Sequence, residues 1–137
     1  MELFDIPDFT GYKASKNGKI YSMIPQGCRN RFDKTKWLQE PKELTYRITK
    51  NGYCRVYMRR DSTNKREDVY VHRIIAELFI SNPNNLSDVN HKDSNKANNH
   101  VDNLEWLSHK NNLEYGFLYG NKDRDKLGRF ISKDKKV

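Results

Sequence analysis

The sequence has few of the features that mark secreted, zinc-stabilised or membrane-spanning proteins. Its two cysteines, Cys28 and Cys54, lie far apart and form no C-x-x-C pair. This spacing argues against a disulfide framework or a structural zinc site and favours reduced thiols in a cytosolic setting. The first residues, MELFDIPDF, contain acids and a proline where a signal peptide needs basic residues and an apolar run. Because no stretch approaches the length of a membrane span, we expect a cytoplasmic protein that does not bind membranes.

Apolar residues are also scarce, whereas positive charge is abundant. Hydrophobic residues make up 35% of the 137 positions, but aromatic residues make up 12%. That combination favours one compact folded unit with a modest core over a disordered chain. The 26 lysines and arginines exceed the 18 acids and give a net charge of +8. Such a surplus is typical of nucleic-acid-binding proteins, although a merely soluble basic protein has the same charge.

Turn signals and charge divide the chain into three parts. Residues 1–45 contain a predicted hairpin around Lys16-Asn17-Gly18, followed by a basic loop from Gln26 to Leu44. Residues 46–118 hold the clearest strand and helix patterns. Residues 119–137 form a basic tail that suits contact with phosphates, with plain solvation as the alternative.

The second part begins with a hairpin whose two faces differ in character. Its strands flank the turn Lys50-Asn51-Gly52, where asparagine and glycine tolerate the positive φ of a tight turn. Strand alternation predicts that Cys54, Val56 and Met58 face the core. The opposite face carries Arg55, Tyr57 and Arg59. Alternating rings and guanidinium groups suit contact with a sugar-phosphate backbone, but a solvated outer face has the same pattern.

A helix is expected after this hairpin. Asp61 to Arg66 is interpreted as a polar turn, and Val69 to Val71 as a short strand. Apolar residues then recur at helical spacing from Val71 to Phe79, and Asn82-Pro83 stops the pattern. His72 lies at the helix start, where a hydrogen-bonded structural histidine is the favoured interpretation over a catalytic one.

The most informative segment runs from residue 88 to residue 112 and reads DVNHKDSNKANNHVDNLEWLSHKNN. Val89–His91 and Leu104–Leu107 predict two short strands joined by an asparagine-rich loop. Ser108 is a suitable N-cap for a closing helix, which Gly116 would end. The sequence therefore predicts two strands and a helix, over about residues 86–116, folded around one small polar site.

The spacing V-N-H-x-D-x-N-x-x-N-N-x-V-x-N-L-E-W, followed by an asparagine on the closing helix, resembles the ββα-metal motif of the HNH endonucleases. The upstream VHRIIAELFI resembles the helix that precedes this motif in phage and intron-encoded members. The N-terminal YKASKNGKIYS is similar to a modular segment that those enzymes carry. The resemblance implies an α+β fold, with a small hairpin-rich, DNA-binding N-terminal part (1–45) followed by a nuclease core (46–118).

The resemblance also implies roles for individual residues. His91 would deprotonate the attacking water, while Asn103 would hold the site loop and orient His91 through hydrogen bonds. Asn90 and Asn112 would bind a divalent metal ion that stabilises charge in the transition state. Their amide oxygens favour Mg²⁺ or Mn²⁺ over Zn²⁺. Asn111 is the alternative ligand if the helix register differs by one residue.

Further DNA contacts are expected at Lys96 and His100, with a solvated role as the alternative for the histidine. Asp93, Asn95 and Asn99 are interpreted as loop structure. The partner implied is double-stranded DNA, and the origin implied is a phage or mobile element acting in a bacterial host cell. A monomer with one such site would nick, whereas a homodimer would cut both strands.

Asn90 departs from the commonest family pattern, which has aspartate at this position. An amide oxygen binds a hard cation but brings no negative charge, so we expect lower metal affinity. This departure supports an alternative hypothesis, in which the chain is a sequence-selective DNA-binding module with a weakened nuclease site. An RNA-binding protein is disfavoured because no RNA-recognition signature occurs.

Overall fold

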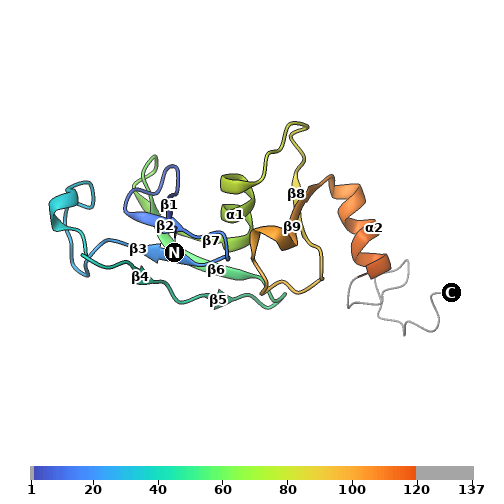
Figure 1. The fold of residues 1–137 in the computed structure, drawn as a ribbon, viewed down its shortest axis with the longest axis horizontal. Helices are drawn as coiled ribbons and strands as arrows, with labels where there is room; N and C mark the ends of the chain where they lie inside the picture. Colours follow the sequence, from blue (N-terminus) through green and yellow to red (C-terminus); the bar gives the residue numbers. More distant parts are fainter. Residues whose placement is uncertain (1, 120–137) are drawn as a thin grey trace.

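The computed structural model describes residues 2–119, with side chains described up to residue 114. Figure 1 shows an elongated α+β body, with strands in its N-terminal part and the two α-helices farther along the chain. The predicted fold class, a hairpin-rich part ahead of a ββα core, is confirmed. The predicted basic tail lies outside the described residues, apart from its first position. Neither of the α-helices described has the length and apolar character needed to cross a bilayer.

The first sheet is antiparallel and contains the predicted N-terminal hairpin. Its strands lie in the order β1 (Phe4–Asp5), β2 (Tyr12–Ala14), β3 (Ile20–Ser22) and β4 (Lys42–Glu43). The turn at Lys16-Asn17-Gly18 joins β2 to β3, and Gly18 has a φ of +91° that a glycine adopts without strain. The predicted basic loop contains η1 (Lys34–Lys36), a single 3₁₀ turn, and β4.

The second sheet contains β5 (Arg47–Ile48), β6 (Cys54–Arg60) and β7 (Lys65–Tyr70), again antiparallel. β6 alternates as predicted, since Cys54, Val56 and Met58 are buried while Tyr57 is half exposed. The predicted short strand at residues 69–71 was wrong in its extent. β7 starts at Lys65 because its charged residues pair with β6 through their backbones, and their side chains on the outer face stay in water.

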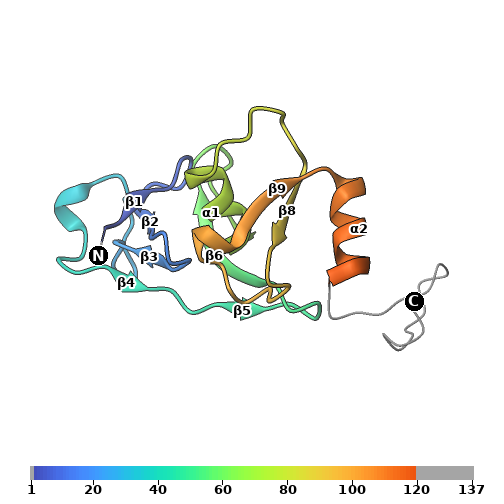
Figure 2. The ribbon, with the colours of Figure 1, turned by 45° about the vertical axis from the view of Figure 1, so that its right-hand side comes forward.

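The predicted helix and ββα arrangement follow. The elements are α1 (Val71–Phe79), β8 (Asp88–His91), η2 (Val101–Asn103), β9 (Leu104–Leu107) and α2 (His109–Tyr119). β8 and β9 form an antiparallel hairpin that lies between α1 and α2, as the turned view in Figure 2 shows. The predicted helix end at Gly116 was wrong, because α2 continues to Tyr119. A glycine inside a helix costs only about 1 kcal/mol, which neighbouring turns offset.

A single hydrophobic core contains side chains from the predicted N-terminal part, residues 1–45, and from the predicted nuclease core, residues 46–118. Ile20 and Ala14 from the first sheet belong to the same buried cluster as Met58 from β6, Ile75 from α1 and Leu104 from β9. Their exposed fractions are 4% or less. Burial of this apolar surface stabilises both sheets and the β8–β9 hairpin together. The N-terminal hairpin is therefore packed against the elements that carry the predicted site.

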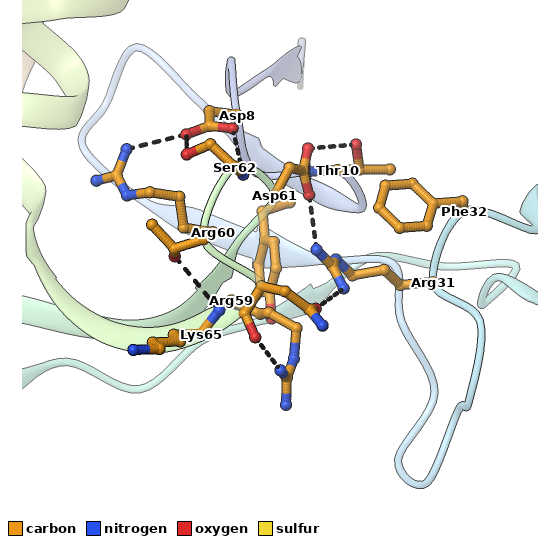
Figure 3. Close-up of polar contacts among 12 residues, drawn as sticks. Asp8, Thr10, Arg31, Phe32, Arg59, Arg60, Asp61, Ser62 and Lys65 are labelled. Atoms are coloured by element: carbon orange, nitrogen blue, oxygen red, sulfur yellow. Dashed lines mark hydrogen bonds and ion pairs between the residues drawn. The ribbon is translucent and has the colours of Figure 1, made fainter.

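A polar network fastens the loop between β1 and β2 to the turn after β6 (Figure 3). The Asp61 carboxylate accepts hydrogen bonds from the backbone N–H and Oγ1 of Thr10, at 3.1 and 2.7 Å, and from Nη2 of Arg31 at 2.9 Å. Asp8 accepts from the backbone N–H and Oγ of Ser62, at 2.9 and 2.7 Å. These charge-assisted bonds fix the first sheet against the second at a site remote in sequence.

Candidate active site

His91 ends β8 and is held by a single buried asparagine. Its imidazole is 5% exposed, and its Nε2 lies 2.8 Å from Oδ1 of Asn99. An amide oxygen can only accept a hydrogen bond, so the hydrogen of a neutral imidazole resides on Nε2. Nδ1 is then the nitrogen with a lone pair. The contact with Asn99 therefore favours the tautomer of His91 in which Nδ1 can accept a proton.

The surroundings of His91 favour its neutral form. Burial lowers the pKa of His91, with a smaller contribution from the charge of Lys96, while the hydrogen bond to Asn99 and the charge of Asp93 oppose this. The net pKa lies below the ordinary value for histidine. A neutral imidazole at neutral pH is the form that can take a proton from water.

His72 and Tyr53 pack beside His91 as a cluster of rings. The ring centroids of His72 and His91 are 5.2 Å apart, and that of Tyr53 lies 6.1 Å from His91. Burial, followed by the charges of His91 and Arg73, lowers the pKa of His72 to about 3. The Nδ1 of His72 is buried and has no hydrogen-bond partner among the described residues. His72 is therefore packed among rings, and its Nδ1 lacks the hydrogen bond expected of a structural histidine.

Asn103 holds the loop that follows His91. Its Nδ2 donates to Oδ1 of Asp93 and to the carbonyl oxygen of Asn98, both at 2.9 Å, and its Oδ1 accepts from the backbone N–H of Asp93 at 3.1 Å. Its predicted hydrogen bonds to His91 are replaced, because Asn99 occupies the position beside the imidazole. Asn103 therefore acts on His91 through the loop, and Asn99 is the direct partner.

The N-terminal hairpin supports Asn99 from outside the ββα unit. The backbone N–H of Val101 donates to the carbonyl oxygen of Lys16 at 2.9 Å, and Tyr46 donates its hydroxyl to the carbonyl oxygen of Gly18. A Cβ atom at Gly18 would lie 2.6 Å from the backbone carbon and oxygen of Asn99. The glycine is thus required for this close approach as well as for its φ.

Asn90 and Asn112, the predicted metal ligands, are each bonded to a different carboxylate. Nδ2 of Asn90 donates to Oε2 of Glu105 on β9 at 3.0 Å. Nδ2 of Asn112 on α2 donates to Oδ2 of Asp88 at 3.0 Å. Asp88 and Asn90 share one face of β8, because they are two residues apart. Glu105 is the direct cross-strand neighbour of Asn90 on β9. The fold therefore brings both asparagines to the face of the hairpin that α2 covers.

The alternative ligand Asn111 is exposed, whereas Asn112 is partly buried, and the backbone N–H of Asn111 donates to the Ser108 hydroxyl that caps α2. Asn112 thus has the better position of the two. The donor set consists of amide oxygens beside carboxylates, which fits a hard divalent cation. Within the described residues no three histidine, cysteine or acidic side chains gather as a metal cluster, so amide oxygens would be essential to such a site.

The predicted DNA-contacting residues of β6 lie on an exposed basic face. Register places Arg55, Tyr57 and Arg59 on the same side as Arg47 of β5 and Arg66 of β7. The guanidinium carbons of Arg47 and Arg66 lie 5.2 and 5.9 Å from the centre of the Tyr57 ring. Asp68 opposes these charges by pairing with Arg47 and Arg55. The face keeps a surplus of positive charge around one half-exposed ring.

Lys96 and His100, the other predicted DNA contacts, have structural partners. Nζ of Lys96 donates to the carbonyl oxygen of Asn51 at 2.9 Å and lies 4.6 Å from the centre of the Tyr53 ring. His100 caps η2, because its Nδ1 accepts from the backbone N–H of Asp102 at 3.1 Å. Lys96 therefore joins the site loop to the β5–β6 turn.

Sequence reasoning missed three polar residues of this site: Asn99, Asp88 and Glu105. Asn99 was interpreted as loop structure, and neither acid was singled out. The alternation of β8 carried one usable signal, since Asp88 shares a strand phase with Asn90. The pairing of Asn99 with His91 depends on how the loop closes, which spacing alone does not reveal.

A family model described as HNH endonuclease matches residues 69–114. Curated relatives include the uncharacterized HNH endonuclease L245 of Acanthamoeba polyphaga mimivirus, which is 34% identical over 112 residues, 82% of this chain and 28% of the relative. DNA endonuclease I-HmuI of Bacillus phage SP01 is 32% identical over 115 residues, 83% of this chain and 56% of the relative.

A solved structure shares the fold as well as the sequence. It is titled "DNA binding and cleavage by the HNH homing endonuclease I-HmuI" and matches with a TM-score of 0.64 and 31% identity. The match covers 85% of this chain and 58% of that chain. The chain thus spans less than two thirds of the length of each of these proteins.

Proposed function

Because this chain belongs to the HNH endonuclease family, we propose that it is a DNA endonuclease that hydrolyses phosphodiester bonds with His91 as the general base. The observation that carries this proposal is the hydrogen bond between Nε2 of His91 and Oδ1 of Asn99, which leaves Nδ1 as the basic nitrogen. Asn90, which precedes His91 on β8, and Asn112 on α2 supply two further amides, each bonded through Nδ2 to a carboxylate. Phage SP01 encodes one relative, and we infer a phage or mobile-element origin and action in the host cytoplasm.

The chemistry begins with water held near Nδ1 of His91. His91 takes one proton from this water, the resulting hydroxide attacks phosphorus, and the bond from phosphorus to the 3′ oxygen breaks. The leaving oxygen takes a proton from solvent, so the products are a 5′-phosphate and a 3′-hydroxyl. Burial keeps His91 neutral before the step, and Asn99 stabilises the imidazolium that forms, because its oxygen accepts from Nε2–H.

Endonucleases of this family generally use a divalent metal ion, and the residues present fit one. Asn90 and Asn112 would hold Mg²⁺ or Mn²⁺ through Oδ1, while their Nδ2 groups stay bonded to Glu105 and Asp88. When bound, the ion supplies positive charge next to the phosphate oxygens and the leaving oxygen. Asn103 keeps the loop after His91 closed during this step through its bonds to Asp93.

Double-stranded DNA is the proposed partner, with the outer face of the β5–β6–β7 sheet as its contact. Arg55 and Arg59 would neutralise phosphates, and Tyr57 would pack against the sugar-phosphate backbone. Lys96 and the half-exposed His100 would add contacts near the scissile strand. One site cuts one strand, so a monomer would nick and a homodimer would break both strands.

A supercoiled-plasmid assay with Mg²⁺ or Mn²⁺ tests this proposal. We expect conversion to nicked or linear DNA that EDTA stops and that His91→Ala slows by about 10²- to 10⁴-fold, the usual contribution of a general base. Asn112→Ala should lose cleavage, whereas the exposed neighbour change Asn111→Ala should retain it. Circular dichroism at the assay temperature controls for folding. Undiminished cleavage by His91→Ala would refute the base.

The alternative function is a DNA-binding module with a weakened nuclease site, favoured by Asn90 in place of the family's commoner aspartate. It predicts retarded migration of a DNA duplex in a gel, with no cleavage under any divalent metal. Cleavage that is abolished in the Asn90→Ala protein would exclude this alternative, because the asparagine would then be an active ligand.

A further inference from the structure

Asn90 and Asn112 share one feature: each donates a hydrogen bond from its side-chain NH₂ group to a carboxylate. A side-chain amide has an oxygen, which a cation attracts, and an NH₂ group, which a cation repels. Asn90 directs its NH₂ group to Glu105, and Asn112 directs its own to Asp88. In each asparagine the hydrogen bond to the carboxylate uses the NH₂ group and not the oxygen. Both amides are therefore held with the NH₂ group on a carboxylate and the oxygen on the opposite side of the amide.

The two carboxylates come from positions that the hairpin brings together. Asp88 precedes Asn90 by two residues, so both side chains leave β8 on the same face, about 7 Å apart along the strand. Glu105 is the direct cross-strand neighbour of Asn90 on β9. α2 lies over this face and places Asn112 above Asp88. Each asparagine thus has one carboxylate of its own.

These carboxylates also supply the charge that Asn90 lacks. Asp88 is mostly buried, with 21% of its side chain exposed, and Asn90 is 8% exposed. Two carboxylates this close to partly buried amide oxygens create a negative potential that attracts a divalent cation, since screening is weaker there than in open water. Nδ1 of the exposed His109 lies 2.9 Å from Oδ2 of Asp88, the same oxygen that accepts from Asn112.

We propose that Asp88 and Glu105 are positioning residues for a divalent cation, each holding the NH₂ group of one asparagine ligand so that its oxygen faces the ion. This inference rests on the proposed function, because it assumes that Asn90 and Asn112 bind the ion. It assigns to Asp88 and Glu105 the negative charge that an aspartate at position 90 would bring to the site. Second-sphere partners of this kind commonly change metal affinity by 10- to 100-fold.

The test is Mn²⁺ binding by the full chain without DNA, measured by calorimetry and by the electron paramagnetic resonance signal of free Mn²⁺. Asp88→Ala and Glu105→Ala should each weaken binding by about 10- to 100-fold. Asp88→Asn and Glu105→Gln keep an acceptor oxygen but lose the charge, so their loss should be smaller. Asp102→Ala is the matched control, since this acid has an 89% exposed side chain and no contact with either asparagine.

The outcomes separate this inference from the proposed function. Mn²⁺ binding and plasmid cleavage by the unaltered chain, with unchanged affinity in both alanine variants, would overturn the roles of Asp88 and Glu105 and leave the nuclease proposal standing. Neither Mn²⁺ binding nor cleavage by the unaltered chain would overturn both. If the alanine variants lose their folded circular dichroism spectrum, Asp88→Asn and Glu105→Gln decide, and an affinity equal to that of Asp102→Ala refutes the inference.

Discussion

Replacing Gly18 by alanine should damage both the stability and the cleavage activity of the chain, although Gly18 lies some eighty positions before Asn99. A Cβ atom at this position would lie 2.6 Å from the backbone carbon and oxygen of Asn99, and the backbone has a φ of +91°. Backbone atoms cannot rotate aside, so the hairpin turn and the site loop must separate. Because Asn99 bonds to His91, this displacement reaches the proposed base.

The expected magnitude has two parts. A non-glycine residue in a left-handed conformation costs about 1–2 kcal/mol. Overpacking against a fixed backbone costs about 1–3 kcal/mol more, so Gly18→Ala should destabilise the fold by roughly 2–5 kcal/mol. At about 4 °C per kcal/mol for a chain of this size, Tm should fall by roughly 8–20 °C. A shift of about 1 Å at Asn99 should slow cleavage by up to about 100-fold.

Gly27→Ala is the matched control for the first part alone. Gly27 has a φ of +79°, and no atom lies within 4 Å of the position its Cβ would take. Its Tm should fall by only about 4–8 °C, and its cleavage rate should stay unchanged. Thermal unfolding by circular dichroism and plasmid cleavage at 20 °C measure the two effects. Equal behaviour of the two variants would refute the close packing of Gly18 on Asn99.

Two further predictions concern the network of Figure 3 and the basic face. Burial raises the pKa of Asp61, but the hydrogen bonds from Thr10 and Arg31 outweigh it, and the net pKa lies below its ordinary value of 3.8. The stabilisation is therefore present above about pH 4 and is lost as pH falls through the lowered pKa. Asp61→Asn should lower the free energy of unfolding at pH 7 by about 2 kcal/mol and lessen its fall between pH 5 and 3, as urea titrations can show. Arg59→Ala should weaken DNA binding and reduce the slope of log K against log salt by about 1, whereas an unchanged slope in fluorescence anisotropy would remove Arg59 from the interface.

Local patterns predicted the elements whose sequence and environment agree. The turns at Lys16-Asn17-Gly18 and Lys50-Asn51-Gly52 and the apolar stripe of α1 are local signals, and the structure contains all three. β7 was underestimated because its charged residues carry no strand pattern, and only pairing with β6 makes that segment extended. The predicted closing helix was shorter than α2, because glycine ends many helices but does not end this one.

The candidate site likewise contains residues that the sequence could predict and partners that it could not. The spacing of the motif was enough to propose site residues, because the resemblance to the family assigns a role to each matched position. These residues are His91, Asn103, Asn90 and Asn112. The hydrogen-bond partners of these residues could not be proposed in this way. Asn99 reaches His91 only after the loop has closed, and the two carboxylates reach the asparagines only through strand register and helix docking. Such pairings arise from tertiary packing and leave no periodic trace in the sequence.

Asn99 lies where the predicted N-terminal part, residues 1–45, meets the predicted nuclease core, residues 46–118. Asn99 is 3% exposed and bonds to His91 on one side, while the backbone of Gly18 packs against it on the other. The hairpin that carries Gly18 is itself anchored by Ala14 and Ile20, which are fully buried in the shared core. The N-terminal segment that resembles a separate DNA-binding module therefore packs against the loop that carries Asn99, the partner of His91. On this geometry, changes in residues 12–22 should alter catalysis as well as DNA binding, because the same backbone that packs in the core supports Asn99, the partner of the proposed base.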